Sequence, residues 1–97
     1  MIRKEKMKAK CYHLYFEGVV QGVGFRYTAH RLADKYNIKG WVRNVPDRRV
    51  EMYAQANLSS LDAFIHAIRE SFRSYITNVD CKEVPLKSEL KDFQIKF

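Results

Sequence analysis

The sequence has few of the residues that build metal sites, disulfide frameworks or membrane segments. Its two cysteines, Cys11 and Cys81, lie far apart and have no metal-ligand spacing with a histidine. No apolar run reaches the length of a membrane span, and the N-terminus lacks the apolar stretch of a secretory signal peptide. We therefore expect a cytoplasmic protein with reduced thiols, no membrane partner and no metal.

Groupings of catalytic side chains are also scarce. The histidines His13, His30 and His66 are isolated, and the last two fall outside the apolar stripes described below, which is typical of surface residues. We find no Ser-His-acid or Cys-His arrangement and no run of carboxylates with magnesium or calcium spacing. These absences disfavour a nucleophilic triad and a carboxylate-bound metal.

The chain has 97 residues, 46% of which are hydrophobic, and this length and composition are enough for one folded domain. The formal net charge of +7 is uneven. Residues 1–10 predict a basic flexible tail and residues 11–97 the domain; a nucleic-acid-binding tail is the alternative. The charges of the tail are Arg3, Lys4, Lys6, Lys8 and Lys10 against Glu5.

Hydrophobic periodicity predicts five strands and two helices. The first helix ends where an asparagine tolerates the left-handed conformation, and the second begins at a serine that can cap free N–H groups, with Asp62 favouring its first turn. The predicted elements are a strand over 11–19, a helix from Phe25 to about Asn37, strands over 39–45 and 50–56 joined by the turn 46–49, a helix starting near Ser59 or Ser60, a strand over 75–84, and a short strand through Phe93, Ile95 and Phe97.

This order predicts an α+β fold, a ferredoxin-like βαββαβ sandwich. We expect a mostly antiparallel sheet of four to five strands, with both helices on one face because each has a single apolar stripe. The first and third strands should be central neighbours, and the fourth should lie beside the first. Cys11 lies in the first predicted strand and Cys81 in the fourth. A disulfide between them would need these two strands to be neighbours, which this fold permits.

The segment Gly18-Val-Val-Gln-Gly-Val-Gly-Phe-Arg26 is the most informative part of the chain. Three glycines between a strand and a helix allow backbone N–H groups to converge at the positive end of the helix dipole. Arg26 adds a planar cation that can bind phosphate or carboxylate through two bonds. The segment lacks the lysine and the serine or threonine of a nucleotide-triphosphate loop, so it predicts a site for one phosphoryl group.

A second segment, Gly40-Trp-Val-Arg-Asn44, places an amide near the end of the second strand. Alone, Asn44 would be a structural turn residue. Together, the two segments resemble the acylphosphatase family, and the similar order of elements extends over roughly residues 11–97. The resemblance implies a metal-free, cofactor-free hydrolase that splits acyl phosphates into a carboxylate and inorganic phosphate.

The resemblance also implies roles for individual residues. Arg26 and Asn44 match the family's catalytic pair, with Asn44 orienting the attacking water. The phosphate-binding residues are Val20, Gln21, Gly22, Val23, Gly24 and Phe25, although the Gln21 side chain is at least as well suited to bracing the loop. Because an amide is not a base at neutral pH, we expect no histidine or carboxylate with an essential pKa. We expect a monomer whose partners are acyl phosphates and inorganic phosphate.

The chain departs from the family pattern outside these segments. Arg48, Ala56 and Arg73 stand where glycines are usual, and a left-handed arginine in the turn would cost about 1–2 kcal/mol. Two other functions stay open. One is an RNA-binding module that uses Tyr15, Tyr53 and the basic tail, which the poor match to RNA-binding strand signatures disfavours. The other is a carbamoyl-phosphate-handling domain of a larger pathway.

Overall fold

The helices and strands follow the periodicities of the sequence in a βαββαβ order with one further strand. The structure is a computed structural model that describes residues 7–97. The elements, in chain order, are β1 (Ala9–Gly18), α2 (Phe25–Tyr36), β2 (Lys39–Asn44), β3 (Val50–Asn57), α3 (Leu58–Ser71), β4 (Ile76–Val84) and β5 (Phe93–Lys96).

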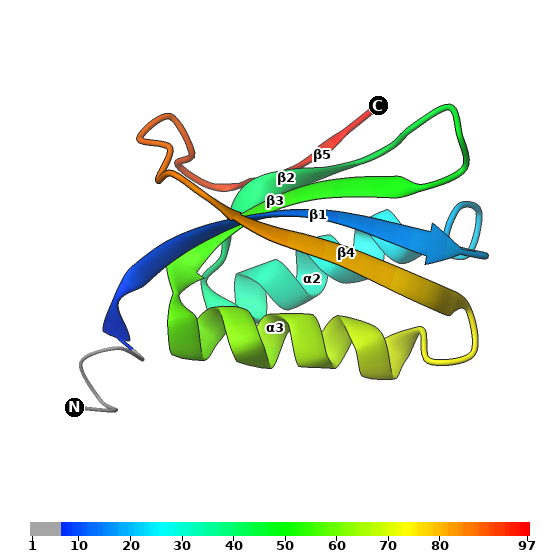
Figure 1. Cartoon of the computed structure of the whole chain (residues 1–97), viewed down its shortest axis with the longest axis horizontal. Coiled ribbons are helices and arrows are strands. Elements are labelled where there is room, and N and C mark those ends of the chain that lie inside the picture. Colours follow the sequence, from blue (N-terminus) through cyan, green and yellow to red (C-terminus); the bar gives the residue numbers. More distant parts are fainter. Residues whose placement is uncertain (1–6) are drawn as a thin grey trace.

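The five strands form one sheet in the order β4-β1-β3-β2-β5. Every neighbouring pair is antiparallel except β2 and β5, which run parallel. Both helices lie on the same face of the sheet (Figure 1). The predicted ferredoxin-like α+β fold is therefore confirmed, including the central pair β1 and β3 and the place of β4 beside β1.

The core lies between the sheet and the two helices, where alternate strand residues meet the apolar helix stripes. Along β1, Leu14 and Phe16 point into this layer and are fully buried, while the residues between them face the other side of the sheet. The helices contribute Phe25, Phe64 and Ile68, which are all buried. Burial of these side chains is the main force that holds the helices on the sheet.

Most strand ends lie within one residue of the sequence predictions, but the start of β1 and the cap of α3 differ from them. Strand β1 begins at Ala9, so Ala9 and Lys10 belong to the sheet rather than to the predicted tail; residues 1–6 lie outside the described residues. The predicted serine cap of α3 was wrong, because the Asn57 side chain accepts a hydrogen bond from the Ser60 N–H at 2.8 Å. Asn37 ends α2 as predicted, with a left-handed φ of 57°.

Helix α3 also starts earlier than predicted, at Leu58 directly after β3. Its first turn contains no acidic residue, so Asp62 does not lie in that turn as the sequence suggested. The helix ends near Phe72, whose N–H donates to the Ile68 carbonyl oxygen at 3.1 Å.

The two cysteines are free, as the sequence predicted, and the register of β1 and β4 explains why. Cys11 pairs with Val84 and Cys81 pairs with Leu14, so the thiols are three residues apart along β1 and project from opposite faces of the sheet. A disulfide needs side chains that point toward each other, which this register prevents. Burial raises the pKa of the Cys11 thiol.

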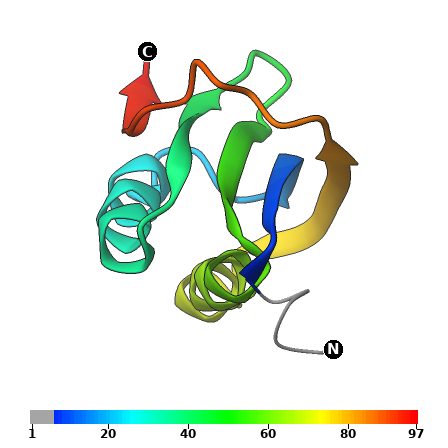
Figure 2. The same ribbon diagram turned by 90° about the vertical axis from the view of Figure 1, so that its left-hand side faces the viewer.

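The face of the sheet away from the helices is crossed at one end by residues 85–92, which connect β4 to β5 (Figure 2). Two hydrogen bonds join Gln55 of β3 to the backbone of Lys87 in this connection. Neither helix within the described part of the chain is long and apolar enough to cross a membrane.

Candidate active site

The glycine-rich loop between β1 and α2 has the backbone that an anion site requires. Gly22 and Gly24 both have a φ of 78°, a left-handed conformation that residues with a Cβ rarely adopt. Gly24 is the N-cap of α2, and no side chain forms a capping hydrogen bond there. The first N–H groups of a helix have no partner within the helix, so this end of α2 offers donors at the positive end of the helix dipole.

Arg26 follows as the second residue of α2 and directs its guanidinium toward the end of the chain. Its Nη1 donates to the Lys96 carbonyl oxygen over a long 3.5 Å, and its Cζ lies 4.8 Å from the centroid of the Phe97 ring. Within residues 7–97 it has no carboxylate partner. Most of its donors therefore remain available to an anion.

Asn44 is the last residue of β2 and approaches the loop from the sheet. Its neighbour in the ladder is Val50, and the strand pairing fixes its backbone. Because Asn44 is two residues after the fully buried Val42, its side chain lies on the helix side of the sheet. The amide is half-buried and, among the described residues, has no hydrogen-bond partner.

The loop, Arg26 and Asn44 surround one open pocket of about 270 Å³. Among residues 7–97, Arg26 is the only charged residue in its lining, and no described carboxylate of the pocket opposes an anion. The lining residues are Val20, Gly22, Gly24, Phe25, Arg26, Tyr27 and Asn44. This size and charge suit a phosphoryl group whose substituent extends into solvent.

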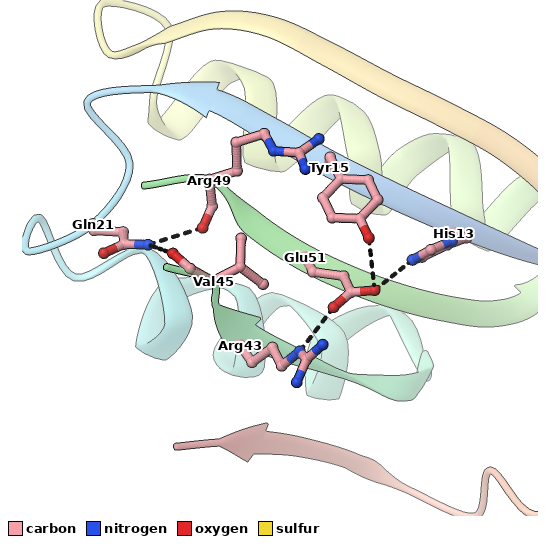
Figure 3. A network of polar contacts seen from close by, with 7 residues as sticks. All are labelled: His13, Tyr15, Gln21, Arg43, Val45, Arg49 and Glu51. Carbon is pink, nitrogen blue, oxygen red and sulfur yellow. Dashed lines mark hydrogen bonds and ion pairs between the residues drawn. The ribbon is translucent and has the colours of Figure 1, made fainter. Parts of the chain in front are cut away.

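Six of the eight residues predicted for the site line this pocket, and Gln21 and Val23 do not. The Val23 side chain packs against the core. Gln21 braces the loop: its Nε2 donates to the carbonyl oxygens of Val45 at 2.8 Å and Arg49 at 2.9 Å (Figure 3). Only its backbone can therefore contribute to an anion site in this arrangement.

Sequence reasoning missed Tyr27, which contributes to the rim of the pocket with 65% of its surface exposed. Tyr27 lies off the apolar stripe of α2, two residues after Phe25, and this position could have identified it. No cluster of three or more histidine, cysteine or acidic side chains that could hold a metal ion occurs in residues 7–97.

The turn between β2 and β3, next to Asn44, contains a left-handed residue that is not a glycine, as Asn37 is at the end of α2. Arg48 has a φ of 76°, and its N–H donates to the Val45 carbonyl oxygen at 3.1 Å. Asp47 accepts hydrogen bonds from the Arg49 backbone and side chain, and the Arg49 N–H in particular holds the pKa of Asp47 below its usual range. These contacts fix the turn that follows Asn44.

Comparison with known proteins finds relatives that are similar in sequence and in fold. A family model described as Acylphosphatase matches residues 12–95. An acylphosphatase of Staphylococcus haemolyticus (strain JCSC1435) is 46% identical over 90 residues, which cover 91% of this chain and 98% of that protein. The crystal structure of acylphosphatase from Bacillus subtilis has a TM-score of 0.84 at 35% identity, covering 91% of this chain and 99% of that chain.

A larger protein contains a similar unit. The crystal structure of T. kodakarensis HypF matches with a TM-score of 0.79 at 30% identity, covering 91% of this chain and 12% of that chain. The family model spans most of the sequence, and the relatives match along nearly their whole length. The chain belongs to the acylphosphatase family.

Proposed function

We propose that this protein hydrolyses the carboxyl-phosphate bond of acyl phosphates to a carboxylate and inorganic phosphate. The observation that carries the proposal is the single pocket in which Arg26, Asn44 and the uncapped start of α2 meet. Family membership supports the same reaction. A pocket with one cation and no carboxylate suits the phosphoryl end of such a substrate.

The phosphoryl group would be held by Arg26 and by backbone N–H groups of residues 20–25. Phosphoryl transfer depends mainly on positioning and on stabilising the charge of the equatorial oxygens. Preorganised donors of this kind contribute about 3–4 kcal/mol each in comparable sites. Arg26 and the loop supply positive charge without a metal or another cofactor, and the proposal includes neither.

Asn44 would hold the attacking water through its side-chain amide. The water oxygen forms a bond to phosphorus, the bond from phosphorus to the acyl oxygen breaks, and its electron pair leaves with the carboxylate. Because a carboxylate is a weak base, this leaving group needs little help from an acid. The proton of the water passes to the phosphate product or to solvent, so no residue has to act as a general base.

On the other face of the sheet, Tyr15 and Tyr53, the residues considered for RNA binding, both pack against other side chains, which favours a small-molecule partner over RNA. An RNA-binding sheet presents free aromatic faces to bases. Here the Arg49 guanidinium carbon lies 4.1 Å from the centroid of the Tyr15 ring, and the Tyr15 hydroxyl donates to Glu51. Tyr53 stacks on His13 with a centroid distance of 4.2 Å.

The monomeric state and the cytoplasmic location stay predictions from the sequence.

The decisive experiment is phosphate release from benzoyl phosphate in the presence of EDTA. We expect turnover by the wild type and a fall of roughly 10²–10³-fold or more in Arg26→Ala, because the guanidinium is lost. Arg31→Ala is the matched control, since Arg31 is an exposed arginine of the same helix outside the pocket. Wild-type release no faster than in buffer, or equal losses in both variants, would contradict the proposal.

A further inference from the structure

A second hollow lies on the face of the sheet away from the candidate active site. It measures about 410 Å³, is open to solvent and lies between β2, β3, β5 and the connection 85–92. Trp41 and Tyr53 form its aromatic side, and Lys87, Lys91 and Lys96 surround it. The proposed hydrolysis uses none of these side chains; Lys96 contacts Arg26 only through its backbone carbonyl oxygen.

Strand geometry separates the two sites. Trp41 is opposite Tyr53 in the ladder of β2 and β3, while the next pair, Val42 and Met52, is fully buried against the helices. Successive side chains of a strand point to opposite faces, so the two rings project away from the helices. Asn44, on the same side as Val42, belongs to the other face. A ligand in one pocket would therefore not contact the other.

The aromatic side of the hollow is a packed surface. The rings of Trp41 and Tyr53 have a centroid distance of 4.9 Å, and Tyr53 is supported from behind by the parallel ring of His13. Contacts with Trp41 and His13 limit rotation of the Tyr53 ring, and both Trp41 and Tyr53 line the hollow. Such a surface favours a flat aromatic ligand.

Two lysines place their charges above these rings. The Lys96 Nζ lies 4.5 Å from the centroid of the Trp41 ring, and the Lys87 Nζ lies 5.0 Å from that of Tyr53. Among residues 7–97, neither ammonium forms an ion pair with a carboxylate. Two neighbouring cations without a counter-charge favour binding of an anion.

The acidic residues of the hollow leave these charges available. Glu89 and Asp92 belong to the lining, so three ammonium groups oppose two carboxylates. Asp92 accepts hydrogen bonds from the Gln94 amide at 3.2 and 3.4 Å. Its charge is therefore partly satisfied within the connection, and the net charge of the lining is positive.

The connection that carries Lys87 is anchored at both ends. Gln55 accepts from the Lys87 N–H at 2.8 Å and donates to the Lys87 carbonyl oxygen at 3.0 Å. At the other end, the Gly40 N–H donates to the Asp92 carbonyl oxygen at 2.8 Å. The backbone around the hollow is thus positioned before any ligand arrives, which lowers the entropy cost of binding.

We propose that this hollow binds a small planar aromatic anion of the nucleoside monophosphate class. The base would stack on Trp41, and the phosphate would take the ammonium groups of Lys87 and Lys96. Both lysines have flexible stems, so their charges can move from the ring faces to the phosphate when the base arrives. Ring and charge are both required, and a ligand with only one of them should bind weakly.

Fluorescence of Trp41 tests the proposal directly, because it is the only tryptophan in the chain. Adenosine monophosphate is titrated with excitation at the red edge of tryptophan absorption, and free N-acetyltryptophanamide corrects for absorption by the ligand. We expect saturable quenching by the nucleotide. Adenosine alone and inorganic phosphate alone should bind at least about tenfold more weakly, since each lacks one of the two interactions.

Variants identify which site the nucleotide occupies. The double variant Lys87→Gln, Lys96→Gln should weaken binding at least about tenfold, whereas Lys82→Gln, an exposed lysine of β4 outside the hollow, should bind like the wild type. Asn44→Ala, a change in the candidate active site outside the lining of the hollow, should leave the quenching unchanged. Absent quenching, equal quenching in the double variant, or its loss in Asn44→Ala would each overturn the proposal. None of these readouts depends on hydrolysis.

Discussion

The side-chain amide of Gln21 lies 2.8 Å from the carbonyl oxygen of Val45, the residue directly after Asn44. A second bond of 2.9 Å joins the same nitrogen to the Arg49 carbonyl oxygen (Figure 3). The glycine-rich loop and the turn that follows Asn44 are therefore tied together by one amide. This link fixes the distance between the loop that would hold the phosphate and the residue that would hold the water.

Gln21→Ala should lower both stability and turnover. The two carbonyl oxygens keep backbone partners, since Val45 accepts from Arg48 and Arg49 accepts from Val45, so the loss in unfolding free energy should be only about 1 kcal/mol. We expect a larger relative fall in kcat, because the loop and Asn44 lose their common support. Denaturant unfolding and steady-state kinetics measure the two effects.

The control for this prediction is Gln94→Ala. Within residues 7–97 its amide hydrogen-bonds only to the exposed Asp92 side chain, so stability and kcat should stay close to the wild type. If Gln21→Ala lowers stability and kcat no more than Gln94→Ala does, the bracing role of Gln21 is wrong.

Arg48→Gly should stabilise the protein. Arg48 has a φ of 76°, and relief of this left-handed strain is worth about 1 kcal/mol, which corresponds to roughly 4–8 °C in Tm for a domain of this size. Turnover should not change, because Arg48 is outside the pocket. Thermal unfolding followed by circular dichroism measures the shift. Asn37→Gly is the comparison, since asparagine already tolerates its φ of 57° and should gain much less. A Tm at or below that of the wild type would show that Arg48 is not strained.

The sequence was sufficient for the fold because each element has a clear period. The alternation of apolar and polar residues in β1 and the i, i+4, i+7 spacing of apolar residues in α2 predicted a sheet covered by helices. The right-handedness of the crossovers then predicted the strand order. The ends were harder. Asn57 ends β3 and caps α3 without an intervening loop, so the serines that follow it looked like better caps. Ala9 and Lys10 were assigned to the tail because the segment around them is basic.

The pocket could be predicted where a motif supplies its backbone, as with Gly22, Gly24 and Arg26. Contacts between distant segments could not. Gln21 has two partners more than 20 residues away, and nothing in the local sequence selects them. The connection 85–92 has no periodicity, so neither its path across the sheet nor the hollow beneath it was foreseeable.

Glu51 should make stability depend on pH in the acid range. It is only 6% exposed and accepts hydrogen bonds from His13 Nε2 at 2.6 Å, Arg43 Nε at 2.7 Å and the Tyr15 hydroxyl at 3.1 Å (Figure 3). Burial alone would raise the pKa of Glu51, but the bonds from His13, Arg43 and Tyr15 outweigh it and lower the pKa. This stabilisation is present above the unfolded-state pKa of about 4.3 and is lost as the pH falls through the lower folded-state value.

Glu51→Gln isolates this contribution. At pH 7 the variant should be less stable by roughly 1.5–3 kcal/mol, because hydrogen bonds to a charged group are lost. The difference from the wild type should shrink as the pH falls below about 4.3, where protonation weakens the wild type too. Denaturant unfolding at a series of pH values measures it. Glu83→Gln, which breaks only the exposed pair with Lys10, should cost at most about 1 kcal/mol. A constant difference from pH 7 to pH 3 would exclude a role for the charge of Glu51.

Asn44→Ala should separate water positioning from phosphate binding. The variant keeps Arg26 and the loop, so the inhibition constant of inorganic phosphate should stay within about twofold of the wild type. Loss of the amide should lower kcat for benzoyl phosphate at least roughly 10²-fold, because the water is no longer oriented. Asn78→Ala, an exposed asparagine of β4, controls for the substitution itself and should leave both constants unchanged. If phosphate affinity instead falls in parallel with kcat, Asn44 contacts the phosphoryl group rather than the water.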